Sequence, residues 1–255
     1  MKIQLNSINY NTYNKYASVP FRSNFYTDSS VNMISDLKQH NEYYCAPTCA
    51  ANALLNLASK GNFHLGENFE NLIEGMAKTM KTSDKGTTSN NMCAGLDEYV
   101  RNMGYNCKIK YQGFRDVNPK YKRDNMPSMA WIKNELDQGK SIIVNIGIYK
   151  KVNENGKAVY KRDSGHYINV IGYGSNGIAK DPNCLTITDP YNKVQGNHYI
   201  KLNKIEEGKF VHNPTDDEVS LTNNAKGFYE ITPRFNYFDP DEIGVLNAAV
   251  SVEVI

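Results

Sequence analysis

The sequence predicts an α+β fold, in which the helices and the sheet come from separate parts of the chain. Segments with helical spacing of apolar residues dominate the first half, up to about Gly139. Segments rich in β-branched and aromatic residues, separated by turn sequences such as Asn155-Gly156, dominate the second half. Helical patterns followed by strand patterns are typical of α+β proteins.

Four helices are expected. In the first, small and apolar residues run from Pro47 to Ala58, and the first turn of a helix tolerates a proline, so Cys45 lies at a helix N-terminus. The other three contain Phe69 to Met76, Met92 to Met103 with a stop at Gly104, and a segment that Ser128 caps and Gly139 ends.

Five strands and a further edge strand are expected in the second half of the chain. The five run from Ile142 to Tyr149, Gly165 to Tyr173, Cys184 to Thr188, His198 to Leu202 and Gly227 to Thr232. The last stretch, from Gly244 to Ile255, ends in an alternating Val-Ser-Val-Glu-Val pattern, which predicts a strand at the edge of the sheet.

The 255-residue chain is long enough to bury one sizeable core, so residues 31–255 are predicted to form a single domain. Residues 1–30 are rich in Asn, Tyr and Ser and follow neither hydrophobic period. We expect them to form a polar leader that is extended or disordered.

Composition argues against several kinds of partner and compartment. Basic and acidic residues nearly balance, at 29 and 27, and no dense Lys or Arg run favours nucleic acid or a membrane surface. No apolar run approaches the roughly 20 residues of a membrane span, and no secretory signal core opens the chain. The five cysteines form no CxxC pair and no metal-ligand grouping. We expect reduced thiols, no metal, and a location that is cytoplasmic or reached by a non-Sec export route.

The residues around Cys45 favour nucleophilic chemistry. A thiol at a helix N-terminus lies near the positive end of the helix dipole and near free backbone N–H groups, which favour the thiolate. Gln39 precedes Cys45 by six residues. A side-chain amide just upstream can join the backbone N–H of the cysteine in donating to an oxyanion, so Gln39 is a candidate for the oxyanion hole.

A general base and its partner are expected from the sheet. The segment Gly165-His166-Tyr167 places His166 at the start of a half-buried strand, and Asp189 ends another strand about twenty residues later, before Pro190. An aspartate that accepts a hydrogen bond from the imidazole orients it for proton transfer. Asp189 is therefore the candidate orienting residue.

These motifs, taken together, resemble the bacteriocin-processing peptidases that cleave double-glycine leaders and their stand-alone relatives in the papain-like superfamily. The resemblance rests on Gln39, Cys45-Ala46-Pro47-Thr48, Gly-His-Tyr at 165–167 and Asp-Pro-Tyr at 189–191, and covers roughly residues 36–192. It implies a papain-like fold with a helical half packed on an antiparallel sheet and the cleft between them. The family usually has Gly after the nucleophile, where this chain has Ala46.

The resemblance implies a catalytic set of Cys45, His166, Asp189 and Gln39 that hydrolyses a peptide or isopeptide bond through a thioester. It implies a peptide or protein substrate and no cofactor. Two alternatives stay open: transfer to an amine or glutamine deamidation, as in papain-like enzymes such as phytochelatin synthases and some bacterial effectors, and an inactive binding module. The oligomeric state is not predicted.

Other cysteines and histidines compete weakly with this set. Cys49 lies one helical turn inside the first helix and has no Gln at the matching spacing, so we expect it to pack beneath the nucleophile. Four further histidines, at 40, 64, 198 and 212, lack the strand context of His166.

Overall fold

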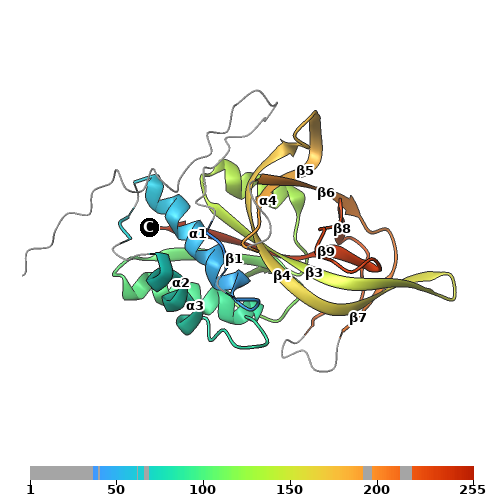
Figure 1. The fold of residues 1–255 in the computed structure, drawn as a ribbon, viewed down its shortest axis with the longest axis horizontal. Coiled ribbons are helices and arrows are strands. Elements are labelled where there is room, and N and C mark those ends of the chain that lie inside the picture. The colour runs from blue at the N-terminus through green and yellow to red at the C-terminus, as the bar shows by residue number, and fades with distance from the viewer. Residues whose placement is uncertain (1–36, 40, 62, 66–68, 192–196, 213–219) are drawn as a thin grey trace, which may run out of the picture.

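The molecule has two halves (Figure 1). Three helices form one half, and a strongly curved sheet, against which a fourth helix packs, forms the other. The computed structural model describes residues 37–39, 41–61, 63–65, 69–191, 197–212 and 220–255. The expected leader, residues 1–30, and the expected start of the folded part at residue 31 lie outside the described residues.

All four expected helices are present. They are α1 (Cys45–Ser59), α2 (Phe69–Thr79), α3 (Ser89–Asn102) and α4 (Met129–Asp137). The Ser128 side chain accepts a hydrogen bond from the backbone N–H of Trp131, which confirms the predicted cap of α4. None of the helices in the described part of the chain is long and apolar enough to cross a membrane.

The sheet closes on itself. The described strands are β1 (Cys107–Gly113), β2 (Lys122–Asp124), β3 (Ser141–Glu154), β4 (Lys157–Ser175), β5 (Lys180–Thr188), β6 (Asn197–Lys204), β7 (Lys209–Val211), β8 (Tyr229–Thr232) and β9 (Glu242–Val254). The order is β2-β1-β9-β3-β4-β5-β6-β8, and β8 also pairs with β9. The pairings around the ring from β9 to β8 are antiparallel. The predicted α+β class, with a helical half packed on an antiparallel sheet, is thus confirmed.

The C-terminal strand is central, and the prediction of an edge strand was wrong. β9 pairs with β3 along most of its length, with β1 over residues 248–254 and with β8 at two positions. The polar positions that suggested an exposed face include Ser251, which is buried and donates to the Glu135 carboxylate at 2.6 Å. Buried polar contacts therefore produced the alternation that solvent exposure usually produces.

The predicted start of the His166 strand was also wrong. β4 begins at Lys157 and forms a long hairpin with β3, so His166 lies in the middle of the strand, opposite Ile146. Asn155 and Gly156 form the turn with φ angles of 53° and 80°, as hairpin turns of this kind require. The short strands β1, β2 and β7 were not predicted.

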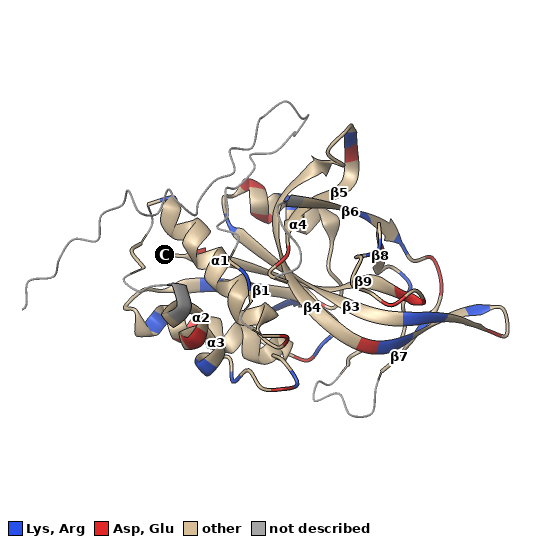
Figure 2. Ribbon diagram, viewed as in Figure 1, with Lys and Arg blue, Asp and Glu red and all other residues tan. Residues whose placement is uncertain are grey.

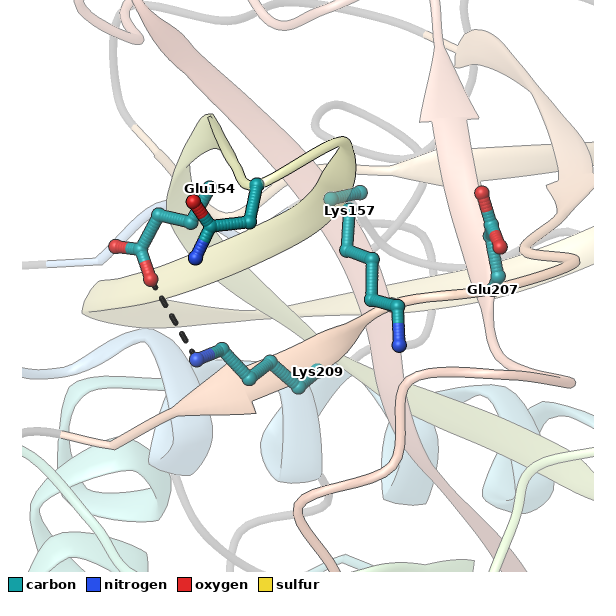
Figure 3. Close-up of a pocket in the computed structure, with 7 residues that line it drawn as sticks. Glu154, Lys157, Glu207 and Lys209 are labelled. Carbon is teal, nitrogen blue, oxygen red and sulfur yellow. Dashed lines mark ion pairs between the residues drawn. The ribbon is translucent and has the colours of Figure 1, made fainter.

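The hairpin tip borders an open hollow of about 710 Å³ between β3, β4 and β7 (Figure 3). Glu154, Lys157, Glu207 and Lys209 line it, and Glu154 pairs with Lys209 at 3.5 Å. None of the described residues that line this hollow carries a thiol or an imidazole.

Helix α1 packs between the other helices and the sheet. It carries no charged residue (Figure 2), and most of its residues are buried. Its contacts are with α2 and α3 on one side and with β3 and β4 on the other. Because both sides of the helix are covered, alanines and other small residues fit where charged ones would lose their solvation.

Replacement of Gly95 by alanine tests the packing of α2 against α3. A Cβ at this position would lie 2.5 Å from the backbone N and Cα of Met80. A Gly to Ala change inside a helix usually stabilises it by roughly 0.5–1 kcal/mol, whereas overpacking costs about 1–3 kcal/mol. We expect Gly95→Ala to lower the free energy of unfolding in urea, and Glu98→Ala, at an exposed position of the same helix, to leave it nearly unchanged. A more stable Gly95→Ala variant would contradict this packing.

Candidate active site

Cys45 is the first residue of α1, as the sequence predicted. No side chain caps this helix end, and its first turn holds no acidic residue. The positive end of the helix dipole therefore acts on the Cys45 thiol without a competing carboxylate in that turn. The residue is 7% exposed, so the thiol lies near the surface but is largely shielded from water.

His166 and Asp189 form a buried pair. Nε2 of His166 lies 2.7 Å from Oδ1 of Asp189, and the side chain of Asp189 has no exposed surface. The pairing of β4 with β5 sets this distance, because Asn169 of β4 lies opposite Thr188, the residue before Asp189. The structure therefore brings together the two residues that the sequence placed 23 positions apart.

The buried pair is charged at neutral pH. Burial alone would lower the pKa of His166, but the charge and hydrogen bond of Asp189, together with a hydrogen bond to Cys45, raise it to about 10. Burial would raise the pKa of Asp189, yet His166 and two further donors hold it below its usual value. Because Nε2 faces Asp189, Nδ1 is the ring nitrogen left for the hydrogen bond to Cys45.

Gln39 is held beside the same pair. Its backbone N–H donates to the carbonyl of Pro190 at 2.8 Å, and Leu37 exchanges two hydrogen bonds with the side chain of Asn52 in α1. The Gln39 side chain is buried, and its Oε1 has no hydrogen-bond partner among the described residues. The segment thus joins α1 to the turn after Asp189 and places the Gln39 backbone beside Pro190.

Tyr237 belongs to this site and was not predicted. Its hydroxyl donates to Oδ2 of Asp189 at 2.6 Å, while the backbone N–H of Tyr191 donates to Oδ1 at 2.9 Å. Tyr237 lies between β8 and β9, outside residues 36–192, to which the family resemblance extended. The aromatic run Phe235-Asn236-Tyr237-Phe238 is visible in the sequence, but no spacing connects it with Asp189.

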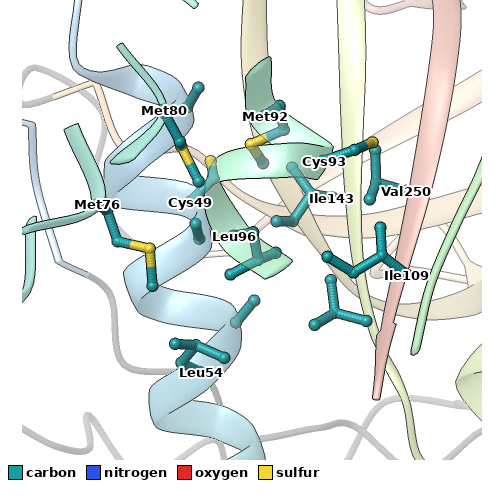
Figure 4. Packing of buried hydrophobic residues seen from close by; sticks show 14 of the residues in the cluster. Cys49, Leu54, Met76, Met80, Met92, Cys93, Leu96, Ile109, Ile143 and Val250 are labelled. Atoms are coloured by element: carbon teal, nitrogen blue, oxygen red, sulfur yellow. The ribbon is translucent and has the colours of Figure 1, made fainter. Parts of the chain in front are cut away.

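The other cysteines are poor nucleophiles in this fold. Cys49 is fully buried among Met76, Met80 and Leu96 (Figure 4), so the prediction that it packs in the core is confirmed. Burial and the nearby Asp97 raise the pKa of Cys107 to about 12. Burial and Asp181 raise that of Cys184 to about 11.

The described residues hold no group of three or more His, Cys, Asp and Glu side chains arranged to bind a metal ion. All five cysteines are free thiols. The groups gathered at this site are therefore the Cys45 thiol, the His166 imidazole and the Asp189 carboxylate, a set of side chains that can carry out nucleophilic catalysis.

The raised pKa of His166 predicts how stability depends on pH. Because the pKa of His166 is higher in the folded state than in the unfolded chain, protonated His166 stabilises the fold. This contribution is fully present below the ordinary value of 6.5 and is lost as the pH rises toward about 10. We expect the advantage of the wild type over Asp189→Asn in the free energy of unfolding to shrink across this range. Urea denaturation measures it. The control Asp181→Asn, which breaks the surface pair with Lys201, should show no such trend. If the advantage of the wild type over Asp189→Asn stays constant from pH 6.5 to about 10, the raised pKa of His166 is contradicted.

Comparison with known proteins places the chain in a family. The model of the Peptidase_C39 like family matches residues 31–216. The peptidase domain of Streptococcus ComA, a bi-functional ABC transporter involved in a quorum-sensing pathway, is similar in structure at 13% identity over 86% of this chain and 95% of that one. The TM-score of this comparison is 0.35. A comparison with curated proteins found no match. Because the family model covers most of the chain, including Gln39, Cys45, His166 and Asp189, this protein belongs to the Peptidase_C39 like family.

Proposed function

We propose that this protein is a cysteine peptidase that hydrolyses a peptide or isopeptide bond through a thioester on Cys45. The observation that carries the proposal is the buried His166, which pairs with Asp189 at 2.7 Å and also hydrogen-bonds Cys45 at the N-terminus of α1. Membership of the Peptidase_C39 like family supports a reaction of the cysteine peptidase type.

The first half of the reaction forms the acyl-enzyme. The Cys45 thiolate attacks the carbonyl carbon of the substrate, and the developing oxyanion receives hydrogen bonds from the Cys45 backbone N–H and the Gln39 amide. The His166 imidazolium then gives its proton to the leaving nitrogen, and the C–N bond breaks. The products are a free amine and a thioester between the acyl group and Cys45.

The second half regenerates the thiolate. Neutral His166 takes a proton from water, and the resulting hydroxide attacks the thioester carbon. The C–S bond breaks, the acid leaves, and the sulfur returns as a thiolate beside a protonated imidazole. Asp189 keeps the imidazole in one orientation through both steps, because its Oδ1 accepts from Nε2 throughout.

Selective alkylation of Cys45 tests the thiolate and imidazolium. Brief iodoacetamide treatment at neutral pH, followed by intact-mass analysis and peptide mapping, should give one fast adduct at Cys45. His166→Ala should slow it strongly, and Cys45→Ala should abolish it. Cys107→Ser serves as the control, because the raised pKa of Cys107 keeps that thiol protonated. If Cys45 reacts no faster than the other four cysteines, the protein is a binding module and the peptidase proposal is wrong.

Replacement of Gln39 separates oxyanion stabilisation from thiol reactivity. Gln39→Ala should lower kcat by about 100 to 1,000-fold on denatured casein or a fluorogenic peptide library, the usual cost of losing one oxyanion donor. Alkylation of Cys45 should proceed at the wild-type rate, because iodoacetamide forms no oxyanion.

The exposed Glu42, between Gln39 and Cys45, provides the control variant Glu42→Ala. Equal kcat loss in both variants, or none in Gln39→Ala, would remove Gln39 from the mechanism.

Mass spectrometry of the cleaved substrate identifies the reaction: a free carboxyl marks hydrolysis, and an amide to an added amine marks transfer.

A further inference from the structure

Tyr237 covers the side of Asp189 that His166 does not use. Its hydroxyl donates to Oδ2 at 2.6 Å, while Nε2 of His166 and the Tyr191 N–H occupy Oδ1. The Tyr237 ring meets the imidazole edge to face with centroids 5.8 Å apart, and lies 4.8 Å from the ring of Tyr191. Both carboxylate oxygens are thus hydrogen-bonded, and two rings contact the imidazole.

Packing, and not the hydrogen bond alone, holds the phenol in place. Phe235 and Phe238 are buried in the apolar cluster inside the closed sheet, and the ring of Tyr237 stacks on Phe235 at 5.3 Å and 6°. The backbone N–H of Phe238 donates to the carbonyl of Phe235 and closes a turn around Tyr237. The hydroxyl is therefore fixed before Asp189 accepts from it, as preorganised active-site groups are.

We propose that Tyr237 is a positioning residue: its hydroxyl fixes the Asp189 carboxylate so that Oδ1 faces His166, and its ring shields the pair from water. This inference rests on the proposed function, because the orientation of His166 matters only if Cys45 attacks an acyl carbon. The residue lies beyond the part of the chain that the family model matches, residues 31–216.

A phenol suits this position better than a cation would. Burial and the charge of Asp189 raise the pKa of Tyr237, so the hydroxyl stays a neutral donor wherever the enzyme works. A lysine or arginine in its place would compete with the His166 imidazolium for the charge of Asp189. The phenol satisfies the second carboxylate oxygen and leaves the ion pair with His166 intact.

Tyr237→Phe removes the hydroxyl and keeps the ring. Asp189 then loses a donor to its charged form, so its pKa should rise by about one unit, the scale of one charge-assisted hydrogen bond. We expect the acidic midpoint of Cys45 alkylation to move to higher pH by a similar amount. On the peptide substrate, kcat should fall about tenfold with KM unchanged. Tyr173→Phe is the matched control, because it removes a phenol hydroxyl that donates to another carboxylate, that of Asp137, outside this site.

A double-mutant cycle tests whether Tyr237 acts through Asp189. In an Asp189→Asn background, adding Tyr237→Phe should cause no further loss of kcat, because the carboxylate is already gone. Additive losses, or an unchanged pH profile in Tyr237→Phe, would overturn the proposal. Should Tyr237→Phe fold poorly, 2,3-difluorotyrosine at 237 retains the hydroxyl as a stronger donor. The acidic midpoint of Cys45 alkylation must then move to lower pH in the fluorinated protein. If that midpoint does not move, the proposal is overturned.

Carbon-13 NMR of the Asp189 carboxyl separates this inference from the proposed function. If Cys45 proves unreactive, the peptidase proposal fails, but the pKa of Asp189 must still rise in Tyr237→Phe if the phenol holds the carboxylate. If Cys45 reacts as expected and the Asp189 titration does not move, the peptidase proposal stands and the role of Tyr237 is overturned.

Discussion

A carboxylate without exposed surface must be compensated inside the fold, and the rest of the site depends on how Asp189 is compensated. Removing one partner of a buried ion pair costs about 3–5 kcal/mol, because the other charge stays buried. Asp189 accepts hydrogen bonds from His166, Tyr191 and Tyr237, and its backbone carbonyl accepts from the Lys38 side chain. These donors come from β4, the turn after β5, the segment before β9 and the segment before α1. The carboxylate therefore joins β4 and the segment before β9 to the turn after β5, and the backbone carbonyl of Asp189 adds the segment before α1.

The packing of α1 brings Cys45 to this point. Small side chains let the helix lie close to β3 and β4, and Asn169 of β4 donates its amide to the carbonyl of Cys49 at 2.9 Å. Asn169 is three residues beyond His166 on the same strand, and Cys49 is four residues beyond Cys45. One buried hydrogen bond thus fixes the helix that carries the thiol against the strand that carries the imidazole.

Local chemistry made part of this arrangement predictable. Helix periodicity, the Ser128 cap, the Asn155-Gly156 turn and the strand that ends before Asp189 depend on neighbouring residues, and each was found as expected. The contacts that were missed join distant segments. The lysines of β1 gave it a polar pattern, and Lys110 instead pairs with buried Glu135 at 2.8 Å. Ser251 of β9 bonds the same carboxylate, so a buried polar network concealed β1 and the central position of β9.

The same reasoning explains why the motif residues are only part of the site. Gln39, Cys45, His166 and Asp189 lie within the family match, whereas β9 and Tyr237 follow it. β9 pairs with β1 beside the helical half and with β3 and β8 in the closed sheet, so it connects the two halves between which the thiol and the imidazole meet. The segment before it supplies the phenol on Asp189. The last forty or so residues thus set the geometry on which the chemistry of the motif residues depends.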